Sequence, residues 1–228
     1  MVRDGYFYGS GFGVAAVLVW MATHSIVLAC VPVLLAAFFL WFFRDPNRSI
    51  PEAPGLIVSP ADGKVTAIET VETATGQQRR ISIFLNVFDV HVNRAPIAGN
   101  VQKIEYTKGK YLNAMNPDSA TLNERNFVEI GGEFCTVSFC QIAGLLARRI
   151  VFKKQVSDWV HRGERVGLIK FGSRVDVRFS LSCELQVRLG DRVRGGSSVL
   201  AIMPPPELIE GFAEISSQAT EPVPELVR

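Results

Sequence analysis

Charged residues are absent from a long stretch near the start of the chain. From Gly5 to Phe43 the sequence contains no Asp, Glu, Lys or Arg, a run of 39 residues. A straight helix of that length would measure roughly 58 Å, whereas the hydrocarbon core of a bilayer is about 30 Å thick. The absence of charge therefore argues against a water-exposed segment, and the length predicts a fold in the run near His24 and Ser25, its most polar point.

The predicted result is a membrane-inserted hairpin of two short helices, about residues 8–23 and 26–43. Arg3 precedes the run and Arg44 follows it. Basic residues on both flanks predict that both ends lie at the cytoplasmic face of the cell membrane. One tilted span with the main domain outside is the competing interpretation. A signal peptide is disfavoured because the apolar run is too long.

Histidine and cysteine are scarce, and neither is arranged for metal binding. The chain has three His and four Cys, and the spacing of Cys135 and Cys140 is not typical of a zinc site. We therefore expect buried free thiols, a reducing compartment and no metal. Net charge is only +2, which gives no basic footprint for nucleic acid, so no nucleic-acid partner is expected.

Beyond residue 50 the sequence is typical of a mainly β protein. Runs rich in β-branched and aromatic residues are separated by Gly, Pro and Asn, at 80–92, 101–106, 127–130, 136–139 and 169–179. The pattern Val-x-x-Gly-acid-Arg-Val occurs at 160–166 and again at 187–193, which predicts two tight turns. We expect a helical hairpin over residues 1–50, a compact barrel-sandwich-like β domain over 51–203 and a mobile tail over 204–228.

Ser173 is the strongest candidate for chemistry. Period-two alternation places it on the apolar face of its predicted strand, beside Val175 and directly after Gly172. A buried hydroxyl needs a partner, and a preceding glycine permits unusual backbone angles. This combination suits attack of the Ser173 hydroxyl on the Gly172 carbonyl. A glycine–serine bulge with a satisfied hydroxyl is the alternative.

His91 is the best candidate base among the three histidines. If 80–92 is one strand, Asp89 and His91 continue the face that begins with Ile81, so that face changes from apolar to polar as it enters a site. A structural histidine is the alternative. Asp62 could accept a hydrogen bond from the His91 imidazole and fix its orientation, although Asp-Gly is also a common turn pair.

A basic–apolar–basic stretch is a further candidate for contact with lipid. Arg148 and Arg149 lie on one side of Ile150–Phe152, and Lys153 and Lys154 on the other. Such a stretch could lie on an anionic bilayer or meet a lipid phosphate. A solvated hairpin edge is the alternative.

Taken together, these stretches resemble phosphatidylserine decarboxylase in its short, membrane-associated form. Each motif is weak alone, but in order along the chain they are highly specific. The matching segments are FFRDP at 42–46, SPADGKV at 59–65, NVFDVHVNRAP at 86–96, QIAG at 141–144 with RRI at 148–150, and GERVG at 163–167 with FGSRVD at 171–176.

The resemblance implies an inactive proenzyme that cuts itself between Gly172 and Ser173. The products would be a β chain of residues 1–172 and an α chain of 56 residues, held together as a heterodimer; whether they assemble further stays open. Residue 173 would become a pyruvoyl group, the only cofactor. That group would form a Schiff base with phosphatidylserine in the membrane and release CO2 to give phosphatidylethanolamine. His91 would be the base and Asp62 its orienting partner.

One departure from the family concerns Arg94. Longer bacterial members carry a second histidine three positions after the one that matches His91, and here that position is Arg94. If the second histidine performs one of the reaction steps in the family, then here either His91 covers that step or Arg94 instead binds a substrate carboxylate or phosphate. Arg148 and Arg149 are further substrate-binding candidates.

Two other functional classes fit the sequence less well than this enzyme. A noncatalytic adaptor or carrier module lacks support because neither repeated turn contains a lysine attachment motif. A conventional serine hydrolase lacks a Gly-x-Ser-x-Gly elbow. A serine-bearing lipid other than phosphatidylserine stays open as the substrate.

Overall fold

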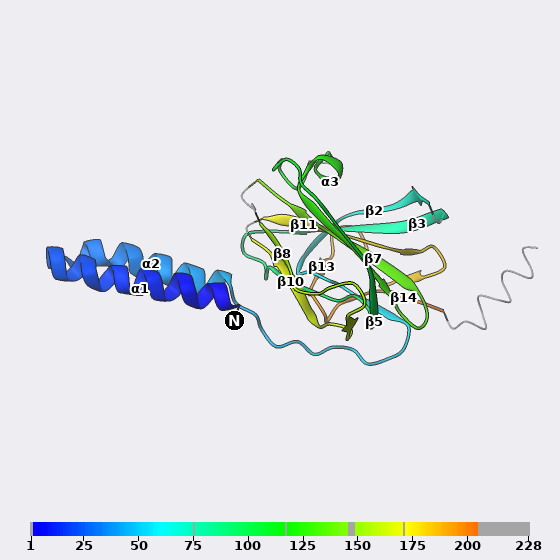
Figure 1. Ribbon diagram of the computed structural model, residues 1–228, viewed down its shortest axis with the longest axis horizontal. Helices are drawn as coiled ribbons and strands as arrows, with labels where there is room; N and C mark the ends of the chain where they lie inside the picture. The colour runs from blue at the N-terminus through cyan, green and yellow to red at the C-terminus, as the bar shows by residue number, and fades with distance from the viewer. Residues whose placement is uncertain (1, 75, 117, 146–148, 171, 205–228) are drawn as a thin grey trace, which may run out of the picture.

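The protein consists of a rod of two helices and a β domain at one end of it (Figure 1). The computed structural model describes residues 2–74, 76–116, 118–145, 149–170 and 172–204. The predicted tail, residues 204–228, lies outside this part of the chain except for Pro204. Within it, the mainly β fold with an apolar N-terminal helix pair is confirmed.

The predicted pair of helices is confirmed, and its insertion in a membrane stays a prediction. Helix α1 spans Arg3–Thr23 and helix α2 spans Ile26–Phe42. The chain reverses at His24, whose φ of 48° is left-handed, and the side chain of Ser25 caps α2 by accepting from the Leu28 amide. Helix α1 is long and apolar enough to cross a membrane, and α2 is apolar but shorter.

The two helices approach closely because of a glycine and a stack of rings. A Cβ on Gly9 would lie 2.6 Å from the end of the Leu40 side chain, so a larger residue there would force Leu40 to move. The rings of Tyr8 and Phe39 stack with centroids 4.9 Å apart, and Phe12 stacks on Phe39 at 5.3 Å. The hairpin therefore has an aromatic seam inside, while its large apolar side chains on the outside are exposed.

The β domain is built from one large curled sheet and two small sheets. The large sheet has the order β13-β2-β3-β11-β7-β6-β5-β9, and the small sheets have the orders β1-β14-β12 and β4-β10-β8. All of these strand pairs are antiparallel. The elements are β1 Leu56–Val58, β2 Gly63–Thr73, β3 Gly76–Leu85, β4 Val92–Arg94, β5 Gly99–Thr107, α3 Ser119–Leu122, β6 Arg125–Gly131, β7 Thr136–Ala143, β8 Ile150–Phe152, β9 Trp159–Val160, β10 Arg165–Ile169, β11 Ser173–Ser180, β12 Glu184–Leu185, β13 Arg192–Val193 and β14 Val199–Ile202.

The core lies on the concave side of the large sheet. Alternate residues of the central strands are fully buried there, among them Ile83 of β3, Phe139 of β7 and Val175 of β11. The free thiols of Cys140 and Cys183 are also buried, as expected, but Cys30 on the hairpin is exposed.

Two of the predicted strands are interrupted. Residues 80–92 do not form one strand, because β3 ends at Leu85 and a turn follows in which the Asn86 amide donates to the Asp89 carboxylate at 2.8 Å. The run 169–179 is likewise divided between β10 and β11, which belong to different sheets. Both interruptions lie next to the candidate residues.

The repeated motif forms the same tight turn twice, as predicted. In the first copy the His161 amide donates to the Glu164 carboxylate at 2.8 Å, and Gly163 has a φ of 74°. In the second the Arg188 amide donates to the Asp191 carboxylate at 2.8 Å, and Gly190 has a φ of 94°. The acidic residue closes each turn, and the glycine supplies the left-handed backbone.

The base of the hairpin is fixed directly to the β domain. Phe42 and Phe43 are buried in a cluster with Leu168 of β10. Arg44 donates to the Phe88 carbonyl at 2.6 Å, and Lys170 forms an ion pair with Asp4 at 3.1 Å. These contacts bring the hairpin against the loops in which the two interrupted strands break.

Candidate active site

Ser173 is the first residue of a strand in the interior of the large sheet. It pairs with Leu85 of β3 on one side and Ala143 of β7 on the other. The residue is fully buried, and its hydroxyl has no hydrogen-bond partner in the described part of the chain. Gly172, just before it, has a φ of 56°, so the chain enters the strand through a left-handed turn. The predicted facing of Ser173 toward the core is confirmed.

His91 lies beside this turn. Its Nε2 accepts a hydrogen bond from the Gly172 amide at 3.2 Å, and its Nδ1 lies 2.9 Å from the Asp89 carbonyl oxygen. Because Nε2 accepts, the hydrogen-bond pattern assigns the proton to Nδ1, which donates to that carbonyl. The lone pair of Nε2 therefore faces the Gly172–Ser173 segment.

Burial keeps the His91 imidazole neutral. Burial lowers the pKa of the imidazole from 6.5 to about 4, while the hydrogen bond to Asp89 raises it by a smaller amount. The ring is consequently neutral at pH 7 and able to accept a proton.

Phe42 forms one wall of the site, which the sequence did not indicate. Its ring centroid lies 4.5 Å from that of His91, and its side chain is completely buried. The motif at 42–46 contains this residue, but only the fold shows that the last turn of the hairpin covers the histidine. The last turn of the hairpin is thus part of the site.

Gly144 is a second residue that sequence reasoning missed. A Cβ at this position would overlap the carbonyl oxygen of Gly172 and touch Ala114. The absence of a side chain therefore allows the Gly172 carbonyl to lie against β7. Its place in the motif at 141–144 was the only signal.

We expect Gly144→Ala to displace the Gly172 carbonyl and to slow any cleavage at 172–173 at least tenfold. Forcing a methyl group into packed backbone costs about 1–3 kcal/mol. The fraction of cleaved chain over time, measured by intact mass, checks this. Gly11→Ala is the control, because a Cβ there meets nothing within 4 Å. Wild-type cleavage in Gly144→Ala would show that the close approach has no role.

The structure does not bring Asp62 into contact with His91. One Asp62 oxygen accepts from Arg48 at 2.7 Å, and the other accepts from the Gly195 amide at 2.8 Å. Burial raises the pKa of Asp62, and the bonds to Gly195 and Arg48 oppose that rise. The predicted orienting contact is therefore replaced by the Asp89 carbonyl. The turn at 59–63 points Asp62 toward Arg48, which lies in the linker between α2 and β1 (residues 43–55). A role for Asp62 in the reaction stays a prediction.

We expect Asp62→Asn to lower the free energy of unfolding by about 1–3 kcal/mol, because the charge opposite Arg48 is lost. Cleavage should slow by less than in a variant lacking His91. Thermal unfolding in detergent and intact mass measure the two effects. Asp118→Asn serves as the control, since the Asp118 side chain makes no cap hydrogen bond. Unchanged unfolding and cleavage would remove Asp62 from the site.

The three arginines predicted to bind substrate differ in their surroundings. Arg94 is buried and donates to the Gly163 carbonyl at 2.9 Å and to Asp45 at 3.1 Å, so it fastens the linker to the β domain. These bonds do not support a contact with substrate. Arg148 lies outside the described residues, and Arg149 is exposed beside Glu124 and Tyr106.

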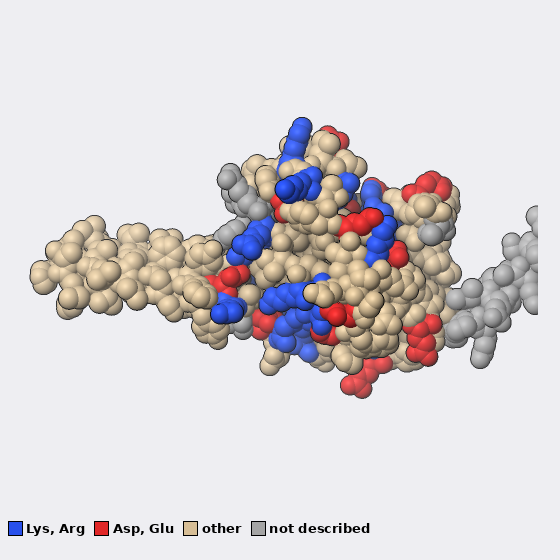
Figure 2. Space-filling model, in the orientation of Figure 1, with Lys and Arg blue, Asp and Glu red and all other residues tan. Residues whose placement is uncertain are grey.

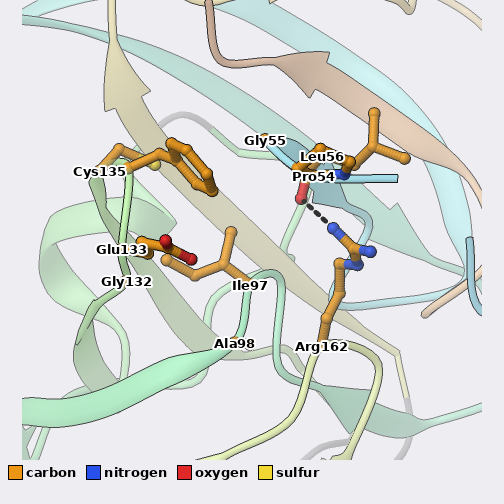
Figure 3. Close-up of a pocket in the computed structure, with 10 residues that line it drawn as sticks. Pro54, Gly55, Leu56, Ile97, Ala98, Gly132, Glu133, Cys135 and Arg162 are labelled. Carbon is orange, nitrogen blue, oxygen red and sulfur yellow. Dashed lines mark hydrogen bonds between the residues drawn. The ribbon is translucent and has the colours of Figure 1, made fainter. Parts of the chain in front are cut away.

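A pocket of about 210 Å³ lies elsewhere in the β domain (Figure 3). Ile97, Phe134 and Cys135 give it an apolar lining, and Arg162 donates across its edge to the Leu56 carbonyl at 3.3 Å. It contains none of the predicted site residues. Within the described ranges, no group of three His, Cys, Asp or Glu side chains could hold a metal ion.

Comparison with known proteins gives one consistent family. The family model described as phosphatidylserine decarboxylase matches residues 35–201. A protein of Solibacter usitatus named phosphatidylserine decarboxylase proenzyme is 52% identical over 203 residues, which cover 88% of this chain and 96% of that protein. Proteins of the same name from Desulfotalea psychrophila and Symbiobacterium thermophilum are 45% and 43% identical, and the matches cover 83% and 90% of this chain and 91% and 96% of theirs.

Proposed function

The chain belongs to the phosphatidylserine decarboxylase family, and on that premise we propose how its own residues mature it and perform the reaction. It is a carboxy-lyase of phospholipid biosynthesis, made as a proenzyme, that converts phosphatidylserine to phosphatidylethanolamine. One observation carries the maturation proposal: the buried Ser173 hydroxyl, which has no hydrogen-bond partner among the described residues, follows a left-handed Gly172 whose amide is bonded to the lone pair of His91.

Self-cleavage begins with the hydroxyl of Ser173. His91 takes the hydroxyl proton at Nε2 after releasing the Gly172 amide, and Oγ attacks the Gly172 carbonyl carbon. The C–N bond breaks, the nitrogen of residue 173 gains a proton, and Gly172 is held as an ester. Removal of the α-proton of residue 173 expels Gly172 as a carboxylate and leaves dehydroalanine. Water then converts dehydroalanine to a pyruvoyl group and releases ammonia.

The surroundings of residue 173 fit this conversion. Because the Ser173 hydroxyl makes no hydrogen bond in the described structure, losing it breaks none. A Cβ on Gly172 would meet no described atom within 4 Å, so there is open space on that side of the residue. The products would be the chains 1–172 and 173–228, which remain paired.

In the mature enzyme the pyruvoyl group supplies an electron sink for the electrons released with CO2. His91 then stands beside residue 173 as a group that can return a proton to the substrate carbon. Phe42 keeps water from one side of the imidazole, and a site of low polarity favours loss of a carboxylate as neutral CO2. We assign residues 1–50 to the membrane and 51–203 to catalysis.

The hairpin is proposed to hold the site at the cytoplasmic surface of the membrane. Figure 2 shows that the rod is nearly free of charge, whereas Lys and Arg side chains gather on the part of the β domain next to it. At the junction Arg44 lies over the Trp41 ring at 4.2 Å, and the exposed Phe88 ring lies 5.9 Å from Trp41. Aromatic and basic side chains together suit an anionic bilayer surface. A lipid headgroup there would lie close to His91.

The direct test combines two measurements on one purified sample. Intact mass should show chains of 172 and 56 residues, with residue 173 bearing a ketone in place of its amine. The same sample should release CO2 from phosphatidylserine vesicles. An uncleaved chain that still releases CO2 would refute the maturation proposal.

A further inference from the structure

A large hollow lies on the face of the main sheet opposite to the core. Its volume is about 780 Å³, and it is formed by strands β2, β3 and β11 together with the turn at 189–192 and the loop at 114–115. The maturation chemistry described above uses none of its lining side chains. Its lining includes Lys64, Phe84, Met115, Arg174, Leu189 and Arg192, together with the acidic side chains of Glu69 and Asp89.

The hollow reaches the reacting residue from two directions. Arg174, on its wall, directly follows Ser173 in the chain. Ala114, also on its wall, is in the contact shell of Gly144, which itself lies against the Gly172 carbonyl. A molecule bound there would lie against the main chain next to residue 173, on the face of β11 opposite to the Ser173 side chain.

A row of basic side chains crosses the wall of this hollow. The strand register pairs Arg192 with Lys64, Lys64 with Phe84, and Phe84 with Arg174. Residues paired across antiparallel strands project from the same face, and neighbouring strands are about 4.8 Å apart. Three cations therefore share one face of the sheet within a span of roughly 14 Å.

These cations differ in what already neutralises them. Arg174 is buried and donates twice to Asp176, at 2.6 and 3.0 Å. Arg192 is largely exposed and lies 3.3 Å from Asp89. Lys64 is exposed, and no ion pair is found for it in the described part of the protein. The row therefore has an unneutralised ammonium group at its centre.

We propose that this hollow binds the headgroup of the phospholipid substrate and that Lys64 binds its phosphodiester. A phosphodiester carries one negative charge, and an ammonium group binds phosphate as a point charge. Arg192, next to Lys64, adds a second cation. The exposed side chains of Met115 and Leu189 at the edge of the hollow suit the apolar side of the glycerol ester. The inference rests on the proposed function, because it names the substrate contacts of the same site.

The test measures decarboxylation of dihexanoyl phosphatidylserine at concentrations where it is monomeric, so that no bilayer contributes. We expect Lys64→Ala to raise KM about tenfold or more and to change kcat less than about threefold, because the phosphate contact exists before and during the reaction. Lys64→Arg should keep KM within about threefold of wild type. Glycerophosphoserine should compete with the substrate in wild type and at least tenfold more weakly in Lys64→Ala.

Lys110→Ala is the matched control, since Lys110 is also exposed, has no ion pair in the described structure and lies outside the hollow. An equal rise of KM in both variants would assign the effect to overall charge and overturn the proposal. Intact mass of each variant distinguishes failure of the proposed headgroup site from failure of the proposed maturation. Complete cleavage with an unchanged KM in Lys64→Ala overturns the headgroup site alone, whereas an uncleaved wild type overturns the proposed maturation.

Discussion

Ser173→Ala will leave one polypeptide of 228 residues with no decarboxylase activity above background. Alanine removes the only atom that attacks the Gly172 carbonyl, so neither the ester nor the new N-terminus forms. Because the Ser173 hydroxyl has no hydrogen-bond partner in the described structure, the substitution should leave the fold intact. Intact mass and CO2 release measure the result.

Ser180→Ala is the control for this variant. Ser180 lies on the same strand, but it is exposed and its hydroxyl bonds to the Ser182 hydroxyl at 2.8 Å. It should mature and turn over at wild-type rates. Cleavage between residues 172 and 173 in Ser173→Ala would mean that another nucleophile acts, and the proposed maturation would be wrong.

His91→Gln is expected to slow self-cleavage by roughly 10²–10⁴-fold, which is the usual contribution of a positioned general base. Glutamine can still accept from the Gly172 amide, but it cannot take a proton. The rate is followed by intact mass after synthesis at a defined time. His161→Gln is the control, because His161 is exposed in the turn before β10. Equal rates in the His91 variant and wild type would exclude the base.

The pH dependence of cleavage distinguishes this histidine from an ordinary one. Burial lowers the pKa of His91 from 6.5 to about 4, so the base should stay active down to about pH 4 and lose activity below it. The same shift in the pKa of His91 affects stability. Between pH 6.5 and about pH 4, His91 binds a proton more readily in the unfolded chain than in the folded protein. Stability is therefore complete above pH 6.5 and falls by about 3 kcal/mol as pH drops toward 4. A cleavage midpoint near 6.5 would contradict the buried, neutral imidazole.

Local patterns in the sequence predicted the elements whose form depends on near neighbours. The break between the helices follows from an uncharged run too long for one span, and the structure places it at His24, as expected. The facing of Ser173 follows from alternation within β11, a property of one strand. The repeated turns follow from a glycine and an acidic residue at fixed spacing.

The parts that could not be predicted depend on contacts between distant segments. His91 reaches Gly172 from a loop, 81 positions away in the chain, and Phe42 covers it from the end of a helix. Alternation along a single strand over 80–92 was the wrong basis for predicting which way the His91 side chain points. The carboxylate of Asp89 closes a turn, and the strand ends early. Asp62 was assigned to His91 by analogy of residue types, whereas its oxygens were already taken by Arg48 and Gly195.

Strand β11 lies between β3 and β7, so the shorter product of maturation supplies a central strand of the sheet, with strands of the longer product on both sides. Insertion of that strand is an intramolecular event only while the bond at 172–173 is intact. Folding must therefore precede cleavage, because the mature protein no longer has the covalent link that holds β11 to the rest of the sheet. Once unfolded, its two pieces would have to find each other at bulk concentration, so the working enzyme is preserved by a slow rate of unfolding.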